Sequence, residues 1–139
     1  MPSDFRAAPL APVSWGELLD KITILEIKAD RIADPAARAN VARELHLLRE
    51  IAAPVLPQPG LAPLIEGLRR VNRALWDIED DIRAKEAAAE FDAGFIQLAR
   101  SVYLTNDERA ALKRQINALL RSDLVEEKCH AAARADRTR

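Results

Sequence analysis

The residues best suited to chemistry lie in an acidic stretch near the middle of the chain. Asp77, Asp80 and Asp81 stand at positions i, i+3 and i+4, so a helix would place their carboxylates close together. Carboxylates grouped in this way can bind one Mg²⁺ through their oxygens. Helical ion pairs are the alternative, because Arg73 precedes Asp77 by four residues and Lys85 follows Asp81 by four. No second acidic motif follows, so we favour ion pairs and expect no metal site and no cofactor.

Two glutamates on apolar helix faces form a second group of candidates. Glu26 falls within the apolar face of a predicted helix, where an unpaired carboxylate is costly. Glu79 lies at the edge of another apolar face, with Arg83 four residues later. Two carboxylates in a helical core can act as acid and base, and they also occur in structural ion pairs. We expect an arginine to bind Glu26 and Glu79 together. The expected cation is Arg83, or otherwise Arg100 or Arg109.

A third polar cluster surrounds a predicted break between two helical segments. Its members are basic, amide or phenolic: Arg100, Tyr103, Asn106, Arg109 and Lys113. The break is predicted at Thr105, because Thr105 and Glu108 have the spacing of a capping box. A helix N-terminus with arginines beside it is suited to binding an anion. Solvated charges at a helix end are the alternative interpretation.

Cys129 and His130 are adjacent and do not suggest a catalytic pair. Successive residues of a helix do not face each other, and His46 is the only other histidine. Neither a zinc site nor a Cys–His nucleophile is therefore indicated. The four glycines are isolated, so the chain also has no glycine-rich phosphate loop.

Helices have to position all of these side chains, because apolar residues recur at spacings of three and four over most of the chain. The longest such pattern predicts a helix over about residues 62–90, about 43 Å long at 1.5 Å per residue. We expect this helix to be central, with the others packed along it. Its apolar face consists of Leu64, Leu68, Val71, Leu75, Ile78 and Ile82.

Capping signals define the remaining helices. The predicted start signals are Ser14 with Glu17, Asp34 with Pro35, Asp92, and Asp123 with Glu126. Four residues of the segment 54–60 are proline or glycine, which predicts a stiff linker there. The last signal predicts a short helix over residues 124–133.

The predicted fold is all-α: an antiparallel helical bundle of four main helices plus a short C-terminal helix. Residues 14–133 are expected to form a single domain. A disordered lead-in at 1–13 precedes it and a frayed tail at 134–139 follows it. Ile24 and Ile27 lie on the face of the first helix opposite its core stripe, and this pattern predicts self-association as a homo-oligomer.

Composition narrows the class of protein. The chain has 139 residues, a net charge of −1 and one cysteine. A charge close to zero argues against nucleic-acid and membrane-surface binding, and a single cysteine fits a reducing compartment. No apolar run reaches the roughly 18 residues of a membrane span, and residues 1–13 lack the features of a signal peptide. We therefore expect a cytoplasmic protein.

Four ordered stretches resemble a bacterial family of small all-helical proteins known as a domain of unknown function. They are Ser14–Lys28, Val71–Arg83, Phe95–Arg109 and Leu124–Lys128. The resemblance implies a link to surface-polysaccharide loci, where such a domain stands near glycosyltransferases and tetratricopeptide-repeat proteins. It implies no activity. The family pattern has Ser and Tyr after the last stretch, where this chain has Cys and His.

Two functional hypotheses remain open. The first is a non-catalytic accessory module that binds a partner protein or a second copy of itself. The second is an enzyme or binding protein that holds an anionic small molecule at a polar site inside the bundle. The candidate residues for that site are Glu26, Asn72, Glu79, Arg83, Arg100, Tyr103, Asn106 and Arg109. A pocket where these side chains converge would favour the second hypothesis, and an exposed apolar surface would favour the first.

Overall fold

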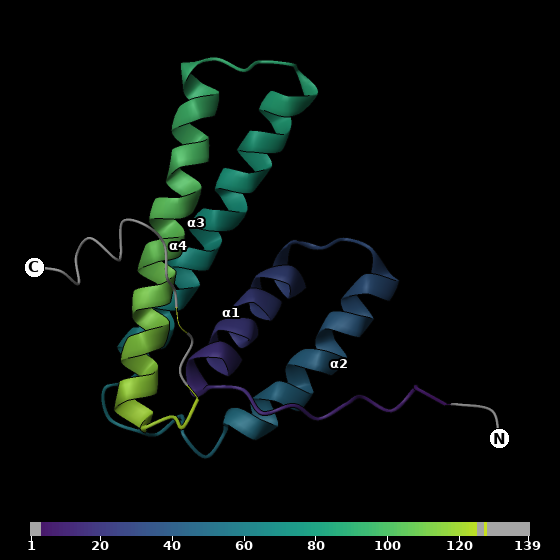
Figure 1. Cartoon of the computed structure of the whole chain (residues 1–139). Coiled ribbons are helices and arrows are strands. Elements are labelled where there is room, and N and C mark those ends of the chain that lie inside the picture. Colours follow the sequence, from purple (N-terminus) through teal and green to yellow (C-terminus); the bar gives the residue numbers. More distant parts are fainter. Residues whose placement is uncertain (1–3, 125–126, 128–139) are drawn as a thin grey trace, which may run out of the picture.

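The computed structural model describes residues 4–124 and 127, and this part of the chain contains four helices and no strand (Figure 1). The helices are α1 (Trp15–Arg31), α2 (Pro35–Ala52), α3 (Leu61–Ala87) and α4 (Ala93–Leu120). The predicted all-α class is confirmed. None of these helices is long and apolar enough to cross a membrane.

Side-chain caps start three of the four helices where the sequence predicts them. Ser14 Oγ accepts the Glu17 N–H at 3.1 Å, and Asp34 Oδ2 accepts the Ala37 N–H at 2.9 Å. Asp92 Oδ1 accepts the N–H of the third residue of α4 at 3.0 Å. Each bond satisfies a backbone donor that the first helical turn leaves without a partner.

Two predicted helix boundaries differ from the structure. The long helix predicted to residue 90 ends at Ala87, because Ala89 adopts a left-handed conformation with φ 54°. The predicted break at Thr105 is wrong, since α4 continues through it for 28 residues. A capping box marks a helix start only where the preceding backbone leaves the helix. Here α3 lies alongside α4 and supports a continuous helix (Figure 1).

The four helices form two antiparallel hairpins of different length. The α3–α4 hairpin is the longer one. Helix α1 packs against both of its helices, near the start of α3 and the end of α4 (Figure 1). Within the described residues, α2 contacts α1 and neither of the other helices. The expectation that every helix packs along the long one is therefore wrong for α2. The central helix is α1, which contacts the other three.

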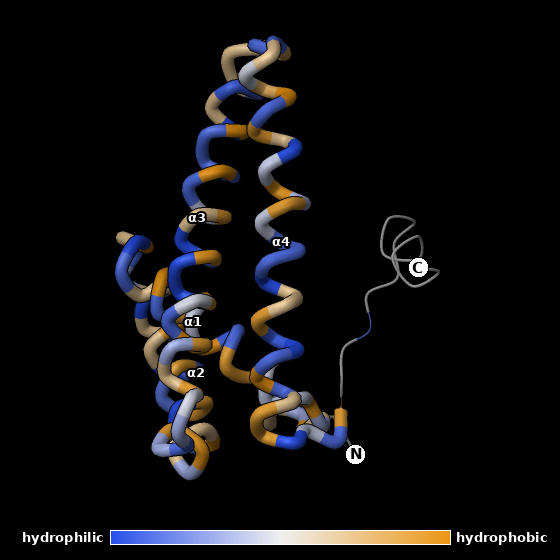
Figure 2. The backbone as a smooth tube through the Cα atoms, turned by 90° about the vertical axis from the view of Figure 1, so that its left-hand side faces the viewer, coloured by the Kyte–Doolittle hydropathy of each residue, from blue (hydrophilic) through white to orange (hydrophobic). Residues whose placement is uncertain are grey.

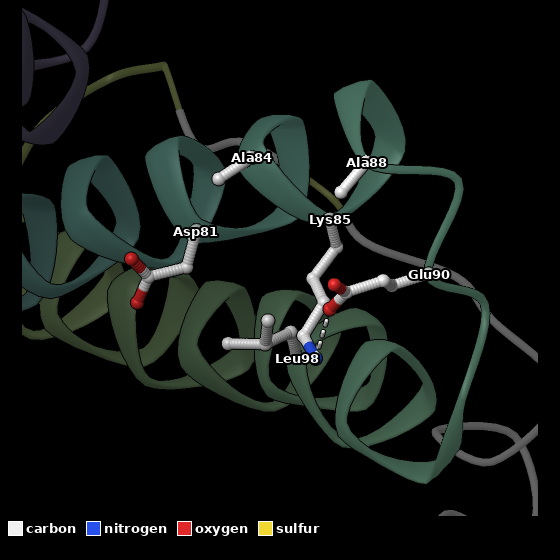
Figure 3. Close-up of a pocket in the computed structure, with 6 residues that line it drawn as sticks. All are labelled: Asp81, Ala84, Lys85, Ala88, Glu90 and Leu98. Carbon is white, nitrogen blue, oxygen red and sulfur yellow. Dashed lines mark hydrogen bonds and ion pairs between the residues drawn. The ribbon is translucent and has the colours of Figure 1, made fainter.

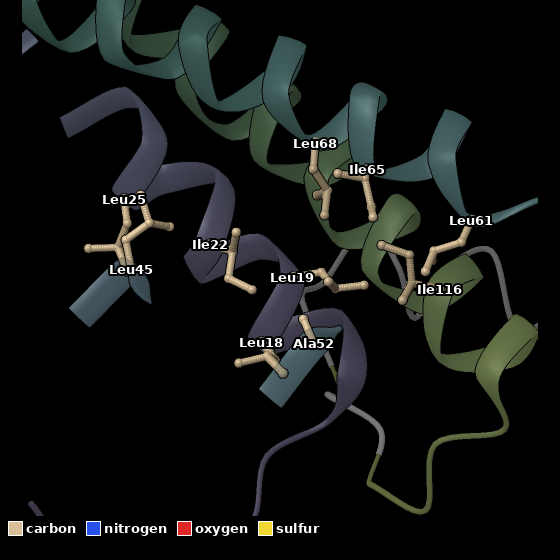
Figure 4. Close-up of a cluster of buried hydrophobic side chains, with 10 residues drawn as sticks. All are labelled: Leu18, Leu19, Ile22, Leu25, Leu45, Ala52, Leu61, Ile65, Leu68 and Ile116. Carbon is tan, nitrogen blue, oxygen red and sulfur yellow. The ribbon is translucent and has the colours of Figure 1, made fainter. Parts of the chain in front are cut away.

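The apolar core lies where α1 meets its three neighbours (Figure 4). Its buried members are Leu18, Leu19, Ile22 and Leu25 of α1, Leu45 and Ala52 of α2, Leu61, Ile65 and Leu68 of α3, and Ile116 of α4. Because α1 is contacted on several sides, Ile27 is only 5% exposed within this chain. The reason for expecting self-association from Ile27 is therefore removed.

A glycine permits the closest approach of α1 to α4. A Cβ atom added at Gly16 would lie 2.6 Å from the backbone oxygen of Lys113 and 2.9 Å from Oδ1 of Asn117. Contacts this short are repulsive, so a larger residue would push the two helices apart. Gly16 thus fixes the distance between the start of α1 and the end of α4.

The outer half of the α3–α4 hairpin, residues 78–104, projects beyond the other two helices (Figure 2). Apolar and polar residues are interspersed along it. Its exposed large apolar residues are Phe91, Ile96, Tyr103 and Leu104. Residues 4–13 form no helix and are exposed. The predicted helix over 124–133 and the predicted tail at 134–139 fall almost entirely outside the described residues, as do Cys129 and His130; Leu124 is not helical.

Candidate functional site

A buried polar cluster joins α1, α3 and α4. At its centre is Asp20 of α1, which is 1% exposed. Arg109 of α4 donates from Nε to Asp20 Oδ1 at 2.9 Å and from Nη2 to Oδ2 at 2.5 Å. Asn72 of α3 donates from Nδ2 to Asp20 Oδ1 and to Thr23 Oγ1, each at 2.9 Å. The Thr23 hydroxyl in turn donates to the backbone oxygen of Asp20 at 2.7 Å.

The same seam continues along α4 on both sides of Arg109. Asn106 Oδ1 accepts a long hydrogen bond of 3.4 Å from Arg109 Nη1. Lys113, which is buried, pairs with Glu17 at 2.7 Å. Asn117 Oδ1 accepts the Gly16 N–H at 2.7 Å, and Asn117 Nδ2 has no hydrogen-bond partner among the described residues. Polar contacts thus join α1 to α4 over several helical turns.

The cluster is built to hold helices together. Asp20 accepts three hydrogen bonds, and the arginine fork meets its carboxylate with two of them. Asp20 is also closed to solvent, so its carboxylate is not accessible from outside the bundle. Asn72, Asn106 and Arg109 therefore lie close together, grouped around Asp20.

Glu26 is paired with a different arginine from those expected. Arg69 donates from Nε to Glu26 Oε2 at 2.8 Å and from Nη2 to Oε1 at 3.3 Å, while Arg49 lies 3.6 Å away. The contact with Glu26 raises the pKa of the Arg69 guanidinium. The prediction of Arg83, Arg100 or Arg109 as the cation is wrong. The register of α1 on α3 sets Arg69 opposite Glu26, and Arg83 lies about 21 Å further along α3.

A groove of about 250 Å³ lies between α1 and α3 beside this ion pair. It is lined by Thr23, Glu26, Ile27, Asp30 and Arg31 of α1 and by Arg69 and Arg73 of α3. Arg31 pairs with Asp77 of α3, so the predicted helical pair between Arg73 and Asp77 is replaced by a contact between helices. The groove therefore has a charged rim over two buried residues, Thr23 and Ile27.

Four of the predicted site residues lie outside both the cluster and the groove. Glu79, Arg83, Arg100 and Tyr103 are exposed on the outer half of the α3–α4 hairpin. Glu79 and Arg83 form no ion pair with any described residue. The side chain of Tyr103 raises the pKa of the Arg100 guanidinium. Since α4 is continuous here, no helix N-terminus is present to create the expected anion site.

A shallow hollow of about 410 Å³ lies on the same hairpin near the α3–α4 turn (Figure 3). Its lining residues are Asp81, Ala84, Lys85, Ala88, Glu90 and Leu98. Lys85 contacts Glu90 at 3.2 Å and Asp92 at 3.0 Å, so the predicted pair with Asp81 is wrong. The pKa of Lys85 is raised by these carboxylates, Asp92 first. The hollow thus combines a small apolar floor with a charged edge.

No group of three or more His, Cys, Asp or Glu side chains in the described part of the chain is placed to hold a metal ion. Sequence reasoning missed Asp20 and Thr23, the centre of the polar cluster. A signal for them was present, because Ile27 follows Asp20 by seven residues and Thr23 by four, on one helix face. The isoleucine indicated that this face is buried, and the polar residues beside it therefore needed partners.

The fold and the polar cluster define an all-α protein in which one central helix is tied to a longer hairpin. The chain belongs to the family of unknown function DUF6165, whose model matches residues 11–136. No curated protein and no solved structure matches the chain.

Proposed function

We propose that this protein is a non-catalytic interaction module whose outer α3–α4 hairpin binds a partner protein. The supporting observation is that residues 78–104 project without cover from the other described helices while carrying large exposed apolar side chains. Ile96 is 59% exposed, and Tyr103 and Leu104 are 52% exposed. Ile96 and Tyr103 are seven residues apart, so they lie on one face of α4. Exposed apolar residues grouped on one face are typical of binding surfaces.

The charge of this hairpin favours a particular kind of partner. Residues 78–104 contain six acidic and three basic side chains, a net charge of −3. A second copy would bring the same negative charge against it, which disfavours pairing of two identical hairpins. A partner surface that combines basic and apolar residues is complementary. We place this interaction in the cytoplasm, and its link to surface-polysaccharide synthesis rests on the sequence resemblance alone.

The alternative, an anion-binding or catalytic site inside the bundle, has less support. The eight residues proposed for it do not converge on one pocket: three lie in the buried cluster, one beside the α1–α3 groove and four on the hairpin. Asp20 and Arg109, which do meet, satisfy each other. Binding through the hairpin therefore accounts better for the exposed residues.

Photo-crosslinking from the hairpin in the source cells tests the proposal. A photoreactive amino acid at Tyr103 is expected to capture one defined protein, because Tyr103 lies within the proposed surface. The double variant Ile96→Ser/Leu104→Ser, with the photoreactive residue retained, should lose that product.

The matched control changes two exposed apolar residues of α2, Leu47 and Ile51, to serine. This variant should retain the crosslink, since α2 lies away from the hairpin. Equal loss in both variants, or capture of many proteins at similar yield, would contradict the proposed surface. Capture of the same chain only would show instead that the hairpin binds a second copy.

A further inference from the structure

The charged residues between α1 and α3 follow a regular order. These helices run in the same direction, and Glu26 of α1 pairs with Arg69 of α3 at 2.8 Å. A step of four residues advances about 6 Å along each helix and nearly restores the same face. Asp30 and Arg73 lie one such step beyond Glu26 and Arg69. The repeat therefore predicts a second ion pair between Asp30 and Arg73.

This second ion pair, between Asp30 and Arg73, is not formed in the structure. The side chains of Asp30 and Arg73 are exposed, and neither forms an ion pair or hydrogen bond with a described residue. Both line the α1–α3 groove, whose volume is about 250 Å³. The groove thus separates a carboxylate on α1 from a guanidinium on α3 that the helix register would otherwise bring together.

The other charges of the groove are already engaged. Arg69 uses Nε and Nη2 on Glu26 and Nη1 on Glu66 at 3.1 Å. Arg31 is paired with Asp77. The available charges are consequently one cation and one anion, with no net charge between them.

We propose that this groove binds a small zwitterion of the α-amino-acid class. Its carboxylate would accept hydrogen bonds from the Arg73 guanidinium, and its ammonium group would donate to the Asp30 carboxylate. The ligand's aliphatic part would lie against Ile27, the buried apolar residue of the groove. A multiply charged anion such as phosphate is a poorer fit, because the open Asp30 carboxylate lines the same groove. The volume also suits an amino acid better than a nucleotide, since pockets for larger ligands run to about 300–1,000 Å³.

Amide chemical-shift titration of the whole ¹⁵N-labelled chain tests this inference with defined probes. Alanine and leucine should shift the signals of residues around Asp30 and Arg73 in a saturable manner. Acetate and methylammonium each supply only one of the two charges, so they should bind about tenfold more weakly or less. Arg73→Gln and Asp30→Asn should each weaken binding of the amino acids about tenfold while leaving the melting temperature unchanged, because both residues are exposed.

Arg70→Gln is the matched control, because Arg70 is the exposed neighbour of the groove and has only a long contact of 3.9 Å with Glu108. It should bind the amino acids as the unchanged chain does. Absence of shifts at about 50 mM alanine and about 50 mM leucine would overturn the proposal. Phosphate or acetate binding as tightly as alanine would overturn it too, as would binding that survives both Arg73→Gln and Asp30→Asn. These outcomes do not involve the hairpin, so they are independent of the proposed partner binding.

Discussion

Replacement of Asp20 by alanine should be among the most destabilising single changes in this chain. The change removes the acceptor of two hydrogen bonds from Arg109 and one from Asn72. Asn72 retains Thr23, and Arg109 retains Asn106 at a long 3.4 Å. The change therefore takes from Arg109 the carboxylate that it meets with two hydrogen bonds at the helix interface.

Burial sets the size of this effect. Removing one partner of a fully buried ion pair costs about 3–5 kcal/mol. The Arg109 side chain is 27% exposed, so water can solvate part of its charge and the lower end applies, about 3 kcal/mol. A domain of this size is stable by about 5–15 kcal/mol, so the variant should still fold. Its melting temperature should fall by about 10 °C.

Urea unfolding followed by circular dichroism measures the difference in free energy of unfolding. Asp80→Ala is the control, because Asp80 is exposed and its loss should change stability by less than about 0.5 kcal/mol. The double variant Asp20→Leu/Arg109→Met should recover about half of the loss, since it removes the cation together with the carboxylate. A loss below about 1 kcal/mol in Asp20→Ala would refute the reasoning that this pair holds α1 in place.

Three further predictions concern single residues. Gly16→Ala should destabilise the chain by about 1–3 kcal/mol in urea unfolding, because its Cβ would meet a backbone oxygen at 2.6 Å. Gly67→Ala should cost less, because its Cβ would meet a movable leucine side chain at 3.0 Å. A larger loss of stability in Gly67→Ala than in Gly16→Ala would contradict this explanation. Glu26→Ala should lower the free energy of unfolding by about 1–2 kcal/mol, less than Asp20→Ala, because the Arg69 side chain is 34% exposed. A loss equal to or larger than that of Asp20→Ala would show that exposure does not weaken the Glu26–Arg69 pair. The pKa of Asp92 should lie below its ordinary value, because it accepts the Phe95 N–H and contacts Lys85. Its contribution to stability is then present above the unfolded-state pKa of about 3.9 and is lost as the pH falls through the lower folded pKa. A ¹³C titration of the Asp92 carboxyl that gives an ordinary pKa would contradict this.

The fold was predictable because its signals are local. Ser14, Asp34 and Asp92 act on backbone groups within three residues, and the spacing of apolar residues is set by helix geometry. The predicted break at Thr105 failed because a local capping pattern is overridden when the helix packs along its neighbour.

The candidate site was predictable only in part, because it depends on the register between helices. Asn72 and Arg109 do lie at the interface between helices, yet nothing local to them indicates that Asp20 is their common partner. Glu26 was correctly expected to bind an arginine, but the choice of Arg69 follows from the way α1 lies against α3. A spacing within one helix does not determine that arrangement.

The central position of α1 has a consequence for synthesis on the ribosome. The contacts that fix α1 to α4 join Gly16 to Asn117 and Trp15 to Ser122, across more than 100 residues of sequence. Translation at about 5–20 residues per second makes α1 wait roughly 4–17 s between its own completion and that of its binding surface on α4. During this interval first α2 and then α3 become available to α1, but the surface of α1 around Gly16 stays uncovered until α4 is made. Nascent chains stalled before α4 should therefore bind chaperones through α1, whereas chains stalled after residue 122 and clear of the exit tunnel should not.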